Sequence, residues 1–415
     1  MSLPSHGMSA DEVLSSLDGF QEHDIRWREG RAFSLVYVAG GEVSEIADEA
    51  HRRYAGTNGL NTAAFPSLQR IQSEVVGAVI DWFHGGSDAA GFITSGGTES
   101  LLLAVKSARE RGRAERGVAR PNVVLPSTAH AAFEKGCHYF DVESRRVPVR
   151  SDWTADPAAM QAACDDDTVL LVASAPQYPQ GVIDPVADIA AIAAARGVNC
   201  HVDACMGGVT LPSLERLGHS LPLWDFRVDG VTSISVDLHK YGYSTKGCGV
   251  LVHRNRKLRS YQTFVTENWL GGLYGSSGIL GTKGGGPWAA AWAVMHHLGN
   301  DGYDRLTSAA RHAAERIAAA VASTPGLVLR AEPAATLLSF GAQDEAALDV
   351  NAVADLLWQR GWYVDRQGPP ASLHLTVNAV HEPLVDAFVS DLRDCVEDAQ
   401  RRQAQGTAGA YGTVE

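Results

Sequence analysis

A lysine in the stretch "SVDLHKYGYSTKG" stands where a reactive amine would be expected. Lys240 follows a strand-like apolar run and precedes a glycine-containing segment. A lysine that only meets solvent needs no such setting, whereas a lysine that forms an imine must first lose its proton. Crowding and burial lower the pKa of an ammonium and so favour that loss. The stretch therefore marks Lys240 as a candidate Schiff-base lysine.

An aspartate ends an earlier apolar run, "HVDACMGG". An unpaired carboxylate at the end of a buried strand is costly, so Asp203 needs a partner. A protonated pyridine nitrogen would serve, because holding that nitrogen protonated makes pyridoxal phosphate an electron sink. A helix cap or an ion pair would satisfy Asp203 equally well, and this pattern alone leaves the alternatives open.

Two further patterns precede Asp203 in the chain. In "TSGGTES", Gly96 and Gly97 allow close backbone approach, and a helix starting near Thr98 would present free N–H groups to a phosphate. The alternative is a tight strand-to-helix turn capped by Thr98, and the segment lacks the dinucleotide pattern GxGxxG. In "STAHAAFEKG", His130 could stack on an aromatic ring or have a purely structural role.

The four patterns gain weight from their order along the chain. They provide, in turn, a phosphate loop, a ring-stacking histidine, a carboxylate for a pyridine nitrogen and an imine-forming lysine. Each signal is weak alone, but together they match one cofactor in every part. The sequence therefore predicts pyridoxal phosphate as the cofactor, with Lys240 as the residue bonded to it.

The segments around these residues alternate between apolar strands and helical patterns. An amphipathic helix is predicted over 68–83, and nearly all-apolar strands alternate with helices over about 85–260. This alternation is typical of α/β folds with a mostly parallel sheet buried on both faces. A long helix is predicted from Trp288, and a smaller α+β domain from about residue 305. The predicted organisation is an N-terminal segment (1–65), a large cofactor-binding domain (66–300), a small C-terminal domain (301–400) and a disordered tail (401–415).

Composition limits the classes of partner. The 415-residue chain is 45% hydrophobic and 20% charged, which is ordinary for a soluble globular enzyme. Its formal net charge of −13 argues against nucleic acids and anionic membranes, since both favour basic surfaces. The six cysteines show no CxxC or zinc-like spacing, which predicts reduced core thiols, no metal site and a cytoplasmic location. No run of about 18–20 apolar residues is present, so no membrane span is expected.

Seven motifs of the chain resemble those of the sphingosine phosphate lyases. They are "TSGGTES", "STAHAAFEKG", "SAPQYPQGVIDP", "HVDACMGG", "SVDLHKYGYSTKG", "GGLYGSSGILGTKGGG" and "GWYVDRQGPPASLHLTV". The similarity covers about residues 33–398 and points to the group II decarboxylase-like enzymes of fold type I. It implies the PLP-dependent transferase fold, with a mostly parallel seven-stranded sheet flanked by helices and a small C-terminal α+β domain. It also implies a homodimer with active sites at the subunit interface.

The resemblance implies roles for individual residues. Lys240 would bond the cofactor, Asp203 would contact the pyridine nitrogen, and His130 would stack on the ring. The other implied cofactor contacts are Gly96, Gly97, Thr98, Ser174, His239 and, from the other subunit, Thr282. Lys240, Tyr241 and Lys246 are candidates for proton transfer, and the sequence does not rank them.

The substrate pocket implied by the resemblance contains one departure. Tyr37 and Lys246 are retained as contacts for a substrate phosphate, and Ser276 is a further predicted contact. Asn61 stands where the lyases usually have a histidine, so a possible cation is replaced by a neutral amide. Arg366 is unusual for the lyases. It could bind a substrate carboxylate through a bidentate contact or be a surface arginine.

These observations favour a PLP-dependent carbon–carbon lyase acting on a small molecule. The predicted reaction is retro-aldol cleavage of a phosphorylated 2-amino-3-hydroxy compound to an aldehyde and phosphoethanolamine. The alternative is an amino-acid decarboxylase or related lyase, in which Asn61 and Arg366 would favour a substrate carboxylate. An inactive scaffold is disfavoured because all four cofactor patterns are intact.

Overall fold

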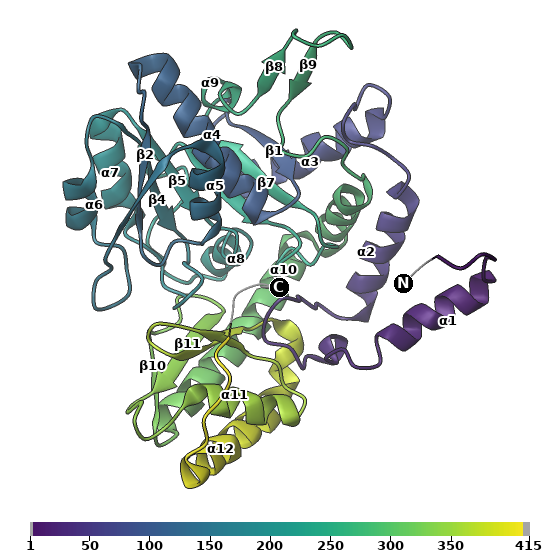
Figure 1. Ribbon diagram of the computed structural model, residues 1–415, viewed down its shortest axis with the longest axis vertical. Coiled ribbons are helices and arrows are strands. Elements are labelled where there is room, and N and C mark those ends of the chain that lie inside the picture. Colours follow the sequence, from purple (N-terminus) through teal and green to yellow (C-terminus); the bar gives the residue numbers. More distant parts are fainter. Residues whose placement is uncertain (1–2, 410–415) are drawn as a thin grey trace.

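The computed structural model describes residues 3–409 and has two lobes joined by one long helix (Figure 1). The larger lobe is built on a seven-stranded sheet of order β1-β7-β6-β5-β4-β2-β3. Its strands are β1 (Ala90–Thr94), β2 (Asn122–Pro126), β3 (Glu143–Val147), β4 (Thr168–Ser174), β5 (Asn199–Asp203), β6 (Ser233–Asp237) and β7 (Gly249–His253).

The sheet is mostly parallel, as predicted. Strands β6, β5, β4, β2 and β3 pair in parallel, whereas β7 runs antiparallel to both of its neighbours, β6 and β1. Five strands are buried along their whole length because both faces of the sheet are covered. The edge strand β3, "ESRRV", was not predicted, because its polar and partly exposed side chains give no strand signal.

Helices cover the two faces of the sheet. On one face, α4 (Gly97–Arg116) and α5 (Ala132–Phe140) form a core cluster with β2 and β4. The other face packs against α3 (Pro66–Trp82), α6 (Pro157–Ala163), α7 (Val186–Arg196) and α8 (Thr210–Arg216). The helix predicted over 68–83 corresponds to α3, and its apolar positions are buried. A short helix, α9 (Arg256–Ser260), follows β7.

The smaller lobe contains an antiparallel sheet of order β10-β11-β13-β12. Its elements are β10 (Leu327–Leu329), β11 (Leu337–Ala342), α11 (Val350–Gln359), β12 (Asp365–Gln367), β13 (Ser372–Thr376), η2 (Ala379–Leu384) and α12 (Val385–Arg402). The long helix α10 (Gly286–Ser323) reaches this lobe through a kink at Gly299, where φ is 58°. The predicted helix therefore continues well past residue 305. The proposed domain boundary after residue 300 falls beside the kink, and the division into domains stays a prediction.

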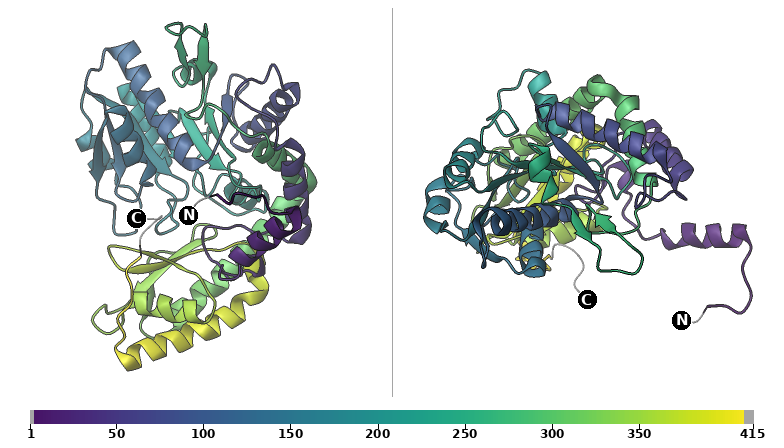
Figure 2. Two further views of the ribbon diagram at one scale, coloured as in Figure 1. Left: turned by 45° about the vertical axis from the view of Figure 1, so that its right-hand side comes forward. Right: turned by 90° about the horizontal axis from the view of Figure 1, so that it is seen from above.

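Two segments extend from the lobes, helix α1 and a hairpin. Helix α1 (Ala10–Phe20) projects from the body and has no buried residue, while α2 (Gly41–Tyr54) lies along α10 (Figure 2). A single 3-10 turn, η1 (Trp27–Glu29), lies between them. A hairpin of β8 (Phe264–Thr266) and β9 (Tyr274–Ser276) extends from the large lobe (Figure 1). Within residues 3–409, no helix is both long and apolar enough to cross a membrane.

The described part of the predicted tail contacts α11, and the disorder of the tail stays a prediction. Helix α12 ends at Arg402, and the chain then runs back over the N-terminal part of α11. The backbone N–H of Gly406 donates to Asp349 Oδ2 over 2.8 Å, and that of Thr407 donates to Asp355 Oδ2 over 2.9 Å. The rest of the predicted tail, 410–415, lies outside the described residues.

Candidate active site

A cavity of about 330 Å³ collects all four sequence patterns at the carboxyl ends of the parallel strands. It is lined by Ser95, Gly96, Gly97, Thr98, Glu99, Leu101, His130, Pro176, Tyr178, Asp203, Cys205, Met206, Asp237, His239 and Lys240. Asp203 and Asp237 are the last residues of β5 and β6, and Lys240 follows three residues later. Ligands of open α/β sheets commonly bind at this edge, outside the carboxyl ends of the strands.

The glycine loop forms one wall of the cavity at the start of α4. Gly96 has φ of 139°, and no side chain caps the helix, so its first N–H groups can meet an anion. A Cβ on Gly96 would lie 2.6 Å from His239 Cε1, and a Cβ on Gly97 would lie 2.8 Å from Asp237 Oδ2. A side chain at either position would therefore have to displace His239 or Asp237, and His239 lies directly against the loop.

Asp203 and His130 are buried in the same cavity. Asp203 is 8% exposed and accepts a hydrogen bond of 3.0 Å from the backbone N–H of Cys205. Burial lowers the pKa of His130, so the imidazole is held in its neutral form. A neutral ring can stack on a flat ligand, while the Asp203 carboxylate can pair with a cationic ring nitrogen. Ser174 lies opposite Asp203 in the register of β4 and β5, outside the cavity lining.

Lys240 pairs with a carboxylate that the sequence patterns did not single out. Its Nζ lies 3.0 Å from Asp237 Oδ2, and the Asp237 side chain is only 2% exposed. Within the described residues, Asp237 Oδ1 is buried without a hydrogen-bond partner. A buried and incompletely paired carboxylate is costly, which is typical of functional sites.

Tyr37 and Lys246 lie together beside the cavity. The Tyr37 hydroxyl approaches Met206 Sδ at 3.7 Å, and Lys246 Nζ lies 5.1 Å from the centre of the Tyr37 ring. Lys246 keeps an exposed surface, but its Nζ donates to the Leu35 carbonyl oxygen over 2.8 Å. Burial of the ammonium, together with the charge of Lys240, lowers the pKa of Lys246 to about 8.

Several predicted residues lie outside the cavity of their own chain. Asn61 and Thr282 are exposed, and the Asn61 side chain accepts from the backbone N–H of Ala63. Ser276, on the hairpin, donates to the Gly278 carbonyl oxygen. Tyr241 is buried in the core and its hydroxyl donates to the Val377 carbonyl oxygen over 2.8 Å. The proposed roles of these residues stay predictions.

Arg366 is engaged by its own lobe. Its Nη2 lies 2.5 Å from Asp355 Oδ1, and its side chain is 20% exposed. Arg366 does not line the cavity that contains Lys240. It lines an adjoining cavity, whose lining also includes His130 and Tyr178. A substrate carboxylate at Arg366 would have to compete with Asp355.

Sequence patterns missed three polar residues of the cavity. Tyr178 donates to Asp365 Oδ2 over 2.6 Å, and burial together with Asp365 raises the pKa of its hydroxyl well above the ordinary value. Glu99 accepts from the backbone N–H of Ser95 and of Ile279, which ties the glycine loop to the segment after the hairpin. Asp237 could have been noticed as a second aspartate ending an apolar strand three residues before Lys240.

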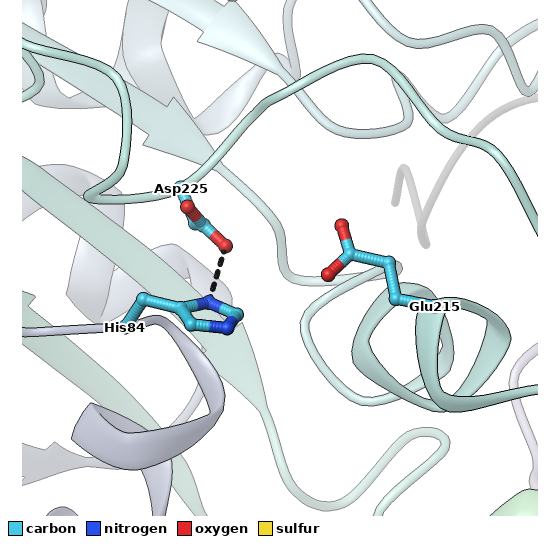
Figure 3. Close-up of side chains that lie close together, drawn as sticks. All are labelled: His84, Glu215 and Asp225. Carbon is cyan, nitrogen blue, oxygen red and sulfur yellow. Dashed lines mark hydrogen bonds and ion pairs between the residues drawn. The ribbon is translucent and has the colours of Figure 1, made fainter. Parts of the chain in front are cut away.

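A cluster of metal-ligand types lies elsewhere, formed by His84, Glu215 and Asp225 (Figure 3). His84 Nδ1 lies 2.9 Å from Asp225 Oδ2. The Arg227 guanidinium contacts both carboxylates, at 2.7 Å from Glu215 and 2.7 Å from Asp225. Because Arg227 already supplies the positive charge that these carboxylates need, the cluster is best explained as an ion-pair network.

The residues of the cavity fit pyridoxal phosphate. An uncapped helix N-terminus and His239 suit its phosphate, and a neutral buried imidazole suits its ring. The Asp203 carboxylate suits its pyridinium nitrogen, and a lysine amine is available to bond its carbonyl carbon. Each requirement is met by a different residue at the same edge of the sheet.

Comparison with known proteins agrees with this geometry. The pyridoxal-dependent decarboxylase conserved domain matches residues 18–343. Sphingosine-1-phosphate lyase 1 of Rattus norvegicus is 36% identical over 419 residues, covering 100% of this chain and 73% of that protein. The sphingosine-1-phosphate lyase of Arabidopsis thaliana is 36% identical, covering 98% of this chain and 75% of that protein.

Solved structures give the same picture. The sphingosine-1-phosphate lyase of Burkholderia pseudomallei superposes with a TM-score of 0.92 at 36% identity, covering 97% of this chain and 94% of that one. The glutamate decarboxylase of Lactobacillus brevis superposes with a TM-score of 0.85 at 21% identity, covering 98% and 96%. The second likeness is informative about the fold alone, which is the one that the sequence predicted.

Proposed function

This chain belongs to the pyridoxal-dependent decarboxylase family, among its sphingosine-1-phosphate lyases, and we propose that it cleaves a phosphorylated 2-amino-3-hydroxy compound. It is a PLP-dependent lyase, and the products of the proposed retro-aldol reaction are an aldehyde and phosphoethanolamine. The observation that carries the proposal is the meeting of Lys240, Asp203 and His130 in one cavity beside a lysine–tyrosine pair suited to a phosphate.

The cofactor and the protein divide the chemistry between them. Pyridoxal phosphate, when bound, supplies an electron sink for a bond broken next to the substrate amine. Asp203 would keep the pyridine nitrogen protonated, and His130 would cover the ring and exclude water from it. Lys240 would hold the cofactor covalently and be released when the substrate amine takes its place. The Asp237 carboxylate, 3.0 Å from Lys240 Nζ, would then stabilise the free lysine as an ammonium.

The substrate phosphate is proposed to bind at Lys246 and Tyr37. A lysine held over a tyrosine ring beside the cavity can meet a phosphate at a fixed distance from the reacting carbons. A pKa of about 8 leaves Lys246 charged at neutral pH, yet allows it to exchange a proton. Lys240 and Lys246 are therefore the proposed proton-transfer groups, while Tyr241 donates to Val377 in the core.

The decarboxylase alternative is less supported. In it Arg366 would bind a substrate carboxylate, and Arg366 is already paired with Asp355. The relatives at 36% identity named above are lyases, whereas the superposed decarboxylase is only 21% identical.

We further propose a homodimer with shared active sites. The segment that carries Asn61 is joined to the segment that carries Thr282, because Asn58 bridges Gly284 and the Gly59 N–H donates to the Lys283 carbonyl oxygen over 2.7 Å. Asn61 and Thr282 are thus expected to serve the same site, and neither lines the cavity of its own chain. Exposed apolar side chains on the adjacent hairpin, Trp269, Leu270 and Leu273, suit a subunit contact.

A cytoplasmic location is proposed on the state of the thiols. All six cysteines of the sequence are unpaired in the structure, as expected for a reducing compartment.

A substrate panel tests the proposed reaction. The purified holoenzyme would be incubated with phosphorylated amino alcohols and with unmodified amino acids, and aldehyde and CO2 would be measured. We expect aldehyde from the phosphorylated amino alcohols and none from Lys240→Ala. Release of CO2 from an amino acid, without aldehyde from the phosphorylated compounds, would instead establish the decarboxylase.

A further inference from the structure

Behind the Asp203 carboxylate lies a polar row of three buried side chains, Ser233, His201 and Ser235. His201 and Asp203 project from the same face of β5, because they are two residues apart. The register of β5 and β6 places Ser233 opposite His201 and Ser235 opposite Asp203. None of the three lines the cavity that contains Lys240, so the polar row can act on a ligand only through Asp203.

The atoms of the polar row form a continuous chain of contacts that ends on Asp203. Ser233 Oγ lies 2.9 Å from His201 Nδ1, and His201 Nε2 lies 3.2 Å from Ser235 Oγ. Ser235 Oγ donates to Asp203 Oδ1 over 3.5 Å, the longest contact of the chain, and accepts from Cys205 Sγ over 3.3 Å. Oδ1 also accepts from the backbone N–H of Cys205. Both of these contacts with the carboxylate use Oδ1, so Oδ2 is the oxygen available to a ligand.

The charge of Asp203 decides the direction of these hydrogen bonds. A carboxylate can only accept, so the single hydroxyl proton of Ser235 is directed to Oδ1. Ser235 Oγ must then accept from His201 Nε2, which places the imidazole proton on Nε2 and leaves Nδ1 to accept from Ser233. Burial lowers the pKa of His201 to about 4, so the ring carries one proton only. Every donor of the polar row therefore points toward Asp203.

Donors aligned in this way have a chemical effect on the carboxylate. Hydrogen bonds to a carboxylate stabilise its charged form, and a charged Asp203 keeps a proton on a ring nitrogen that it contacts. The contacts on Oδ1 also oppose rotation of the carboxylate, so Oδ2 keeps one orientation. His201 packs edge-on against Phe133 as well, with ring centres 5.9 Å apart. A role limited to packing would use that contact and would not need a donor aligned with Asp203.

We propose that His201 and Ser235 are positioning residues, which hold Asp203 charged and oriented toward the ring nitrogen of the cofactor. They act through Asp203 and contact neither the cofactor nor the substrate. The inference rests on the proposed function in one respect, because it takes Asp203 as the partner of the ring nitrogen. It deepens that function by giving a role to two buried residues outside the cavity.

A cofactor analogue without the ring nitrogen isolates this role. In the deaza analogue of pyridoxal phosphate, a C–H group replaces the nitrogen, so the analogue keeps the phosphate and the carbonyl carbon but cannot pair with Asp203. The Kd of each cofactor is measured by titration of the apoprotein. The preference for pyridoxal phosphate, which is the ratio of the two Kd values, reports the Asp203 contact and requires no turnover. A general loss of packing changes both Kd values and leaves the preference unchanged.

Variants of the polar row should reduce this preference. Ser235→Ala deletes one hydrogen bond to the carboxylate, and His201→Phe deletes the donor behind it, so each should lower the preference about tenfold. His201→Gln can present an amide N–H near the position of Nε2, and its preference should stay within about threefold of the wild type. An unchanged preference in Ser235→Ala would overturn the proposal, and this variant decides the question if His201→Phe does not fold.

A second buried histidine provides the matched control. His381 is fully buried, its Nδ1 accepts from the backbone N–H of Asn378, and its Nε2 lies 3.0 Å from the Ala32 carbonyl oxygen. His381→Phe should therefore lower the melting temperature but leave the cofactor preference unchanged. Equal preferences in His201→Phe and His381→Phe would make His201 a packing residue only and would contradict the proposal.

The position of the imidazole proton gives a second readout in the apoprotein. Nitrogen NMR of isotope-labelled histidine side chains distinguishes a protonated from an unprotonated ring nitrogen, and comparison with His201→Gln identifies the signals of His201. We expect the proton on Nε2 at neutral pH. A proton on Nδ1 would reverse the direction of the hydrogen bonds and so contradict the proposal.

Asp203→Asn separates this inference from the proposed function. If that variant loses the preference while Ser235→Ala and His201→Phe keep it, Asp203 is the partner of the ring nitrogen and the polar row is not a positioning device. If Asp203→Asn keeps the full preference, the role assigned to Asp203 is itself wrong, and the inference fails with it. Neither result depends on which substrate is cleaved.

Discussion

The Nζ atom of Lys240 lies 3.0 Å from Oδ2 of Asp237, and glycine flanks that carboxylate on both sides. A Cβ on Gly97 would approach Asp237 Oδ2 at 2.8 Å, and a Cβ on Gly249 would approach Oδ1 at the same distance. The slot between the glycine loop and β7 therefore holds the carboxylate in one position. Under the proposed function, Lys240 would be bonded and free in turn, and the Asp237 carboxylate would give the free ammonium a defined place.

The charge of Asp203 should matter more for turnover than for retention of the cofactor. Asp203→Asn preserves the size of the side chain but removes the charge that would keep the pyridine nitrogen protonated. We expect kcat to fall at least about a hundredfold, the scale of losing a key electrostatic contact in an active site. Cofactor content, read from absorbance after gel filtration, should change little. The control is Asp188→Asn on the exposed side of α7, and near-normal turnover of Asp203→Asn would make Asp203 a structural residue.

The absence of a side chain at Gly97 should be needed for cofactor binding. In Gly97→Ala the new Cβ would meet Asp237 Oδ2 and Cys205 Sγ, at 2.8 and 3.0 Å. Relieving such overpacking costs about 1–3 kcal/mol, so the cofactor Kd should rise roughly five- to hundredfold in a titration of the apoprotein. Gly77→Ala provides the contrast, because Gly77 lies inside α3 with nothing within 4 Å of its Cβ position. That change should raise stability by about 0.5–1 kcal/mol and leave the Kd unchanged.

The residues that sequence reasoning found share a local signal. Gly96, Gly97, His130, Asp203 and Lys240 each follow or end an apolar strand, and the carboxyl ends of parallel strands meet at one edge of a sheet. The family resemblance then supplied roles that the spacing alone left open. The fold could be predicted for the same reason, because the alternation of apolar strands and helical patterns is visible in the sequence.

The features that were missed depend on distant partners. Tyr178 is held by Asp365, which is 187 residues away, and no short pattern reveals that pairing. A long helix was predicted from Trp288 and a smaller domain from about residue 305, but helix α10, which packs against α2 and η2, extends past a kink at Gly299 to Ser323. Gly299 has non-helical φ and ψ, so it interrupts the helix at the kink.

The depressed pKa of Lys246 predicts a pH dependence of substrate capture. Its pKa is about 8, below the ordinary lysine value, so the ammonium is present below that pH and is lost above it. For a phosphorylated substrate, kcat/KM should therefore fall as pH rises through about 8. Lys246→Met should lower kcat/KM about ten- to hundredfold at neutral pH and remove that descending limb. The exposed Lys135→Met is the control, and a limb that persists in Lys246→Met would assign it to another group.

The proposed sharing of sites can be tested by complementation between two inactive chains. Lys240→Ala disables the cavity of its own chain, whereas Thr282→Ala should impair the cavity of the partner. In a heterodimer, one site would carry both changes and the other would carry neither. An equal mixture should therefore recover about a quarter of wild-type activity, the statistical share of intact sites in a twofold dimer. Differently tagged chains that copurify would verify that subunits have exchanged.

The matched control mixes Lys240→Ala with Asp203→Asn, because both residues line the same cavity of one chain and every site in that heterodimer is disabled. Recovery in the first mixture and none in the second is the expected result. Equal behaviour of the two mixtures would show that each site is built within a single chain.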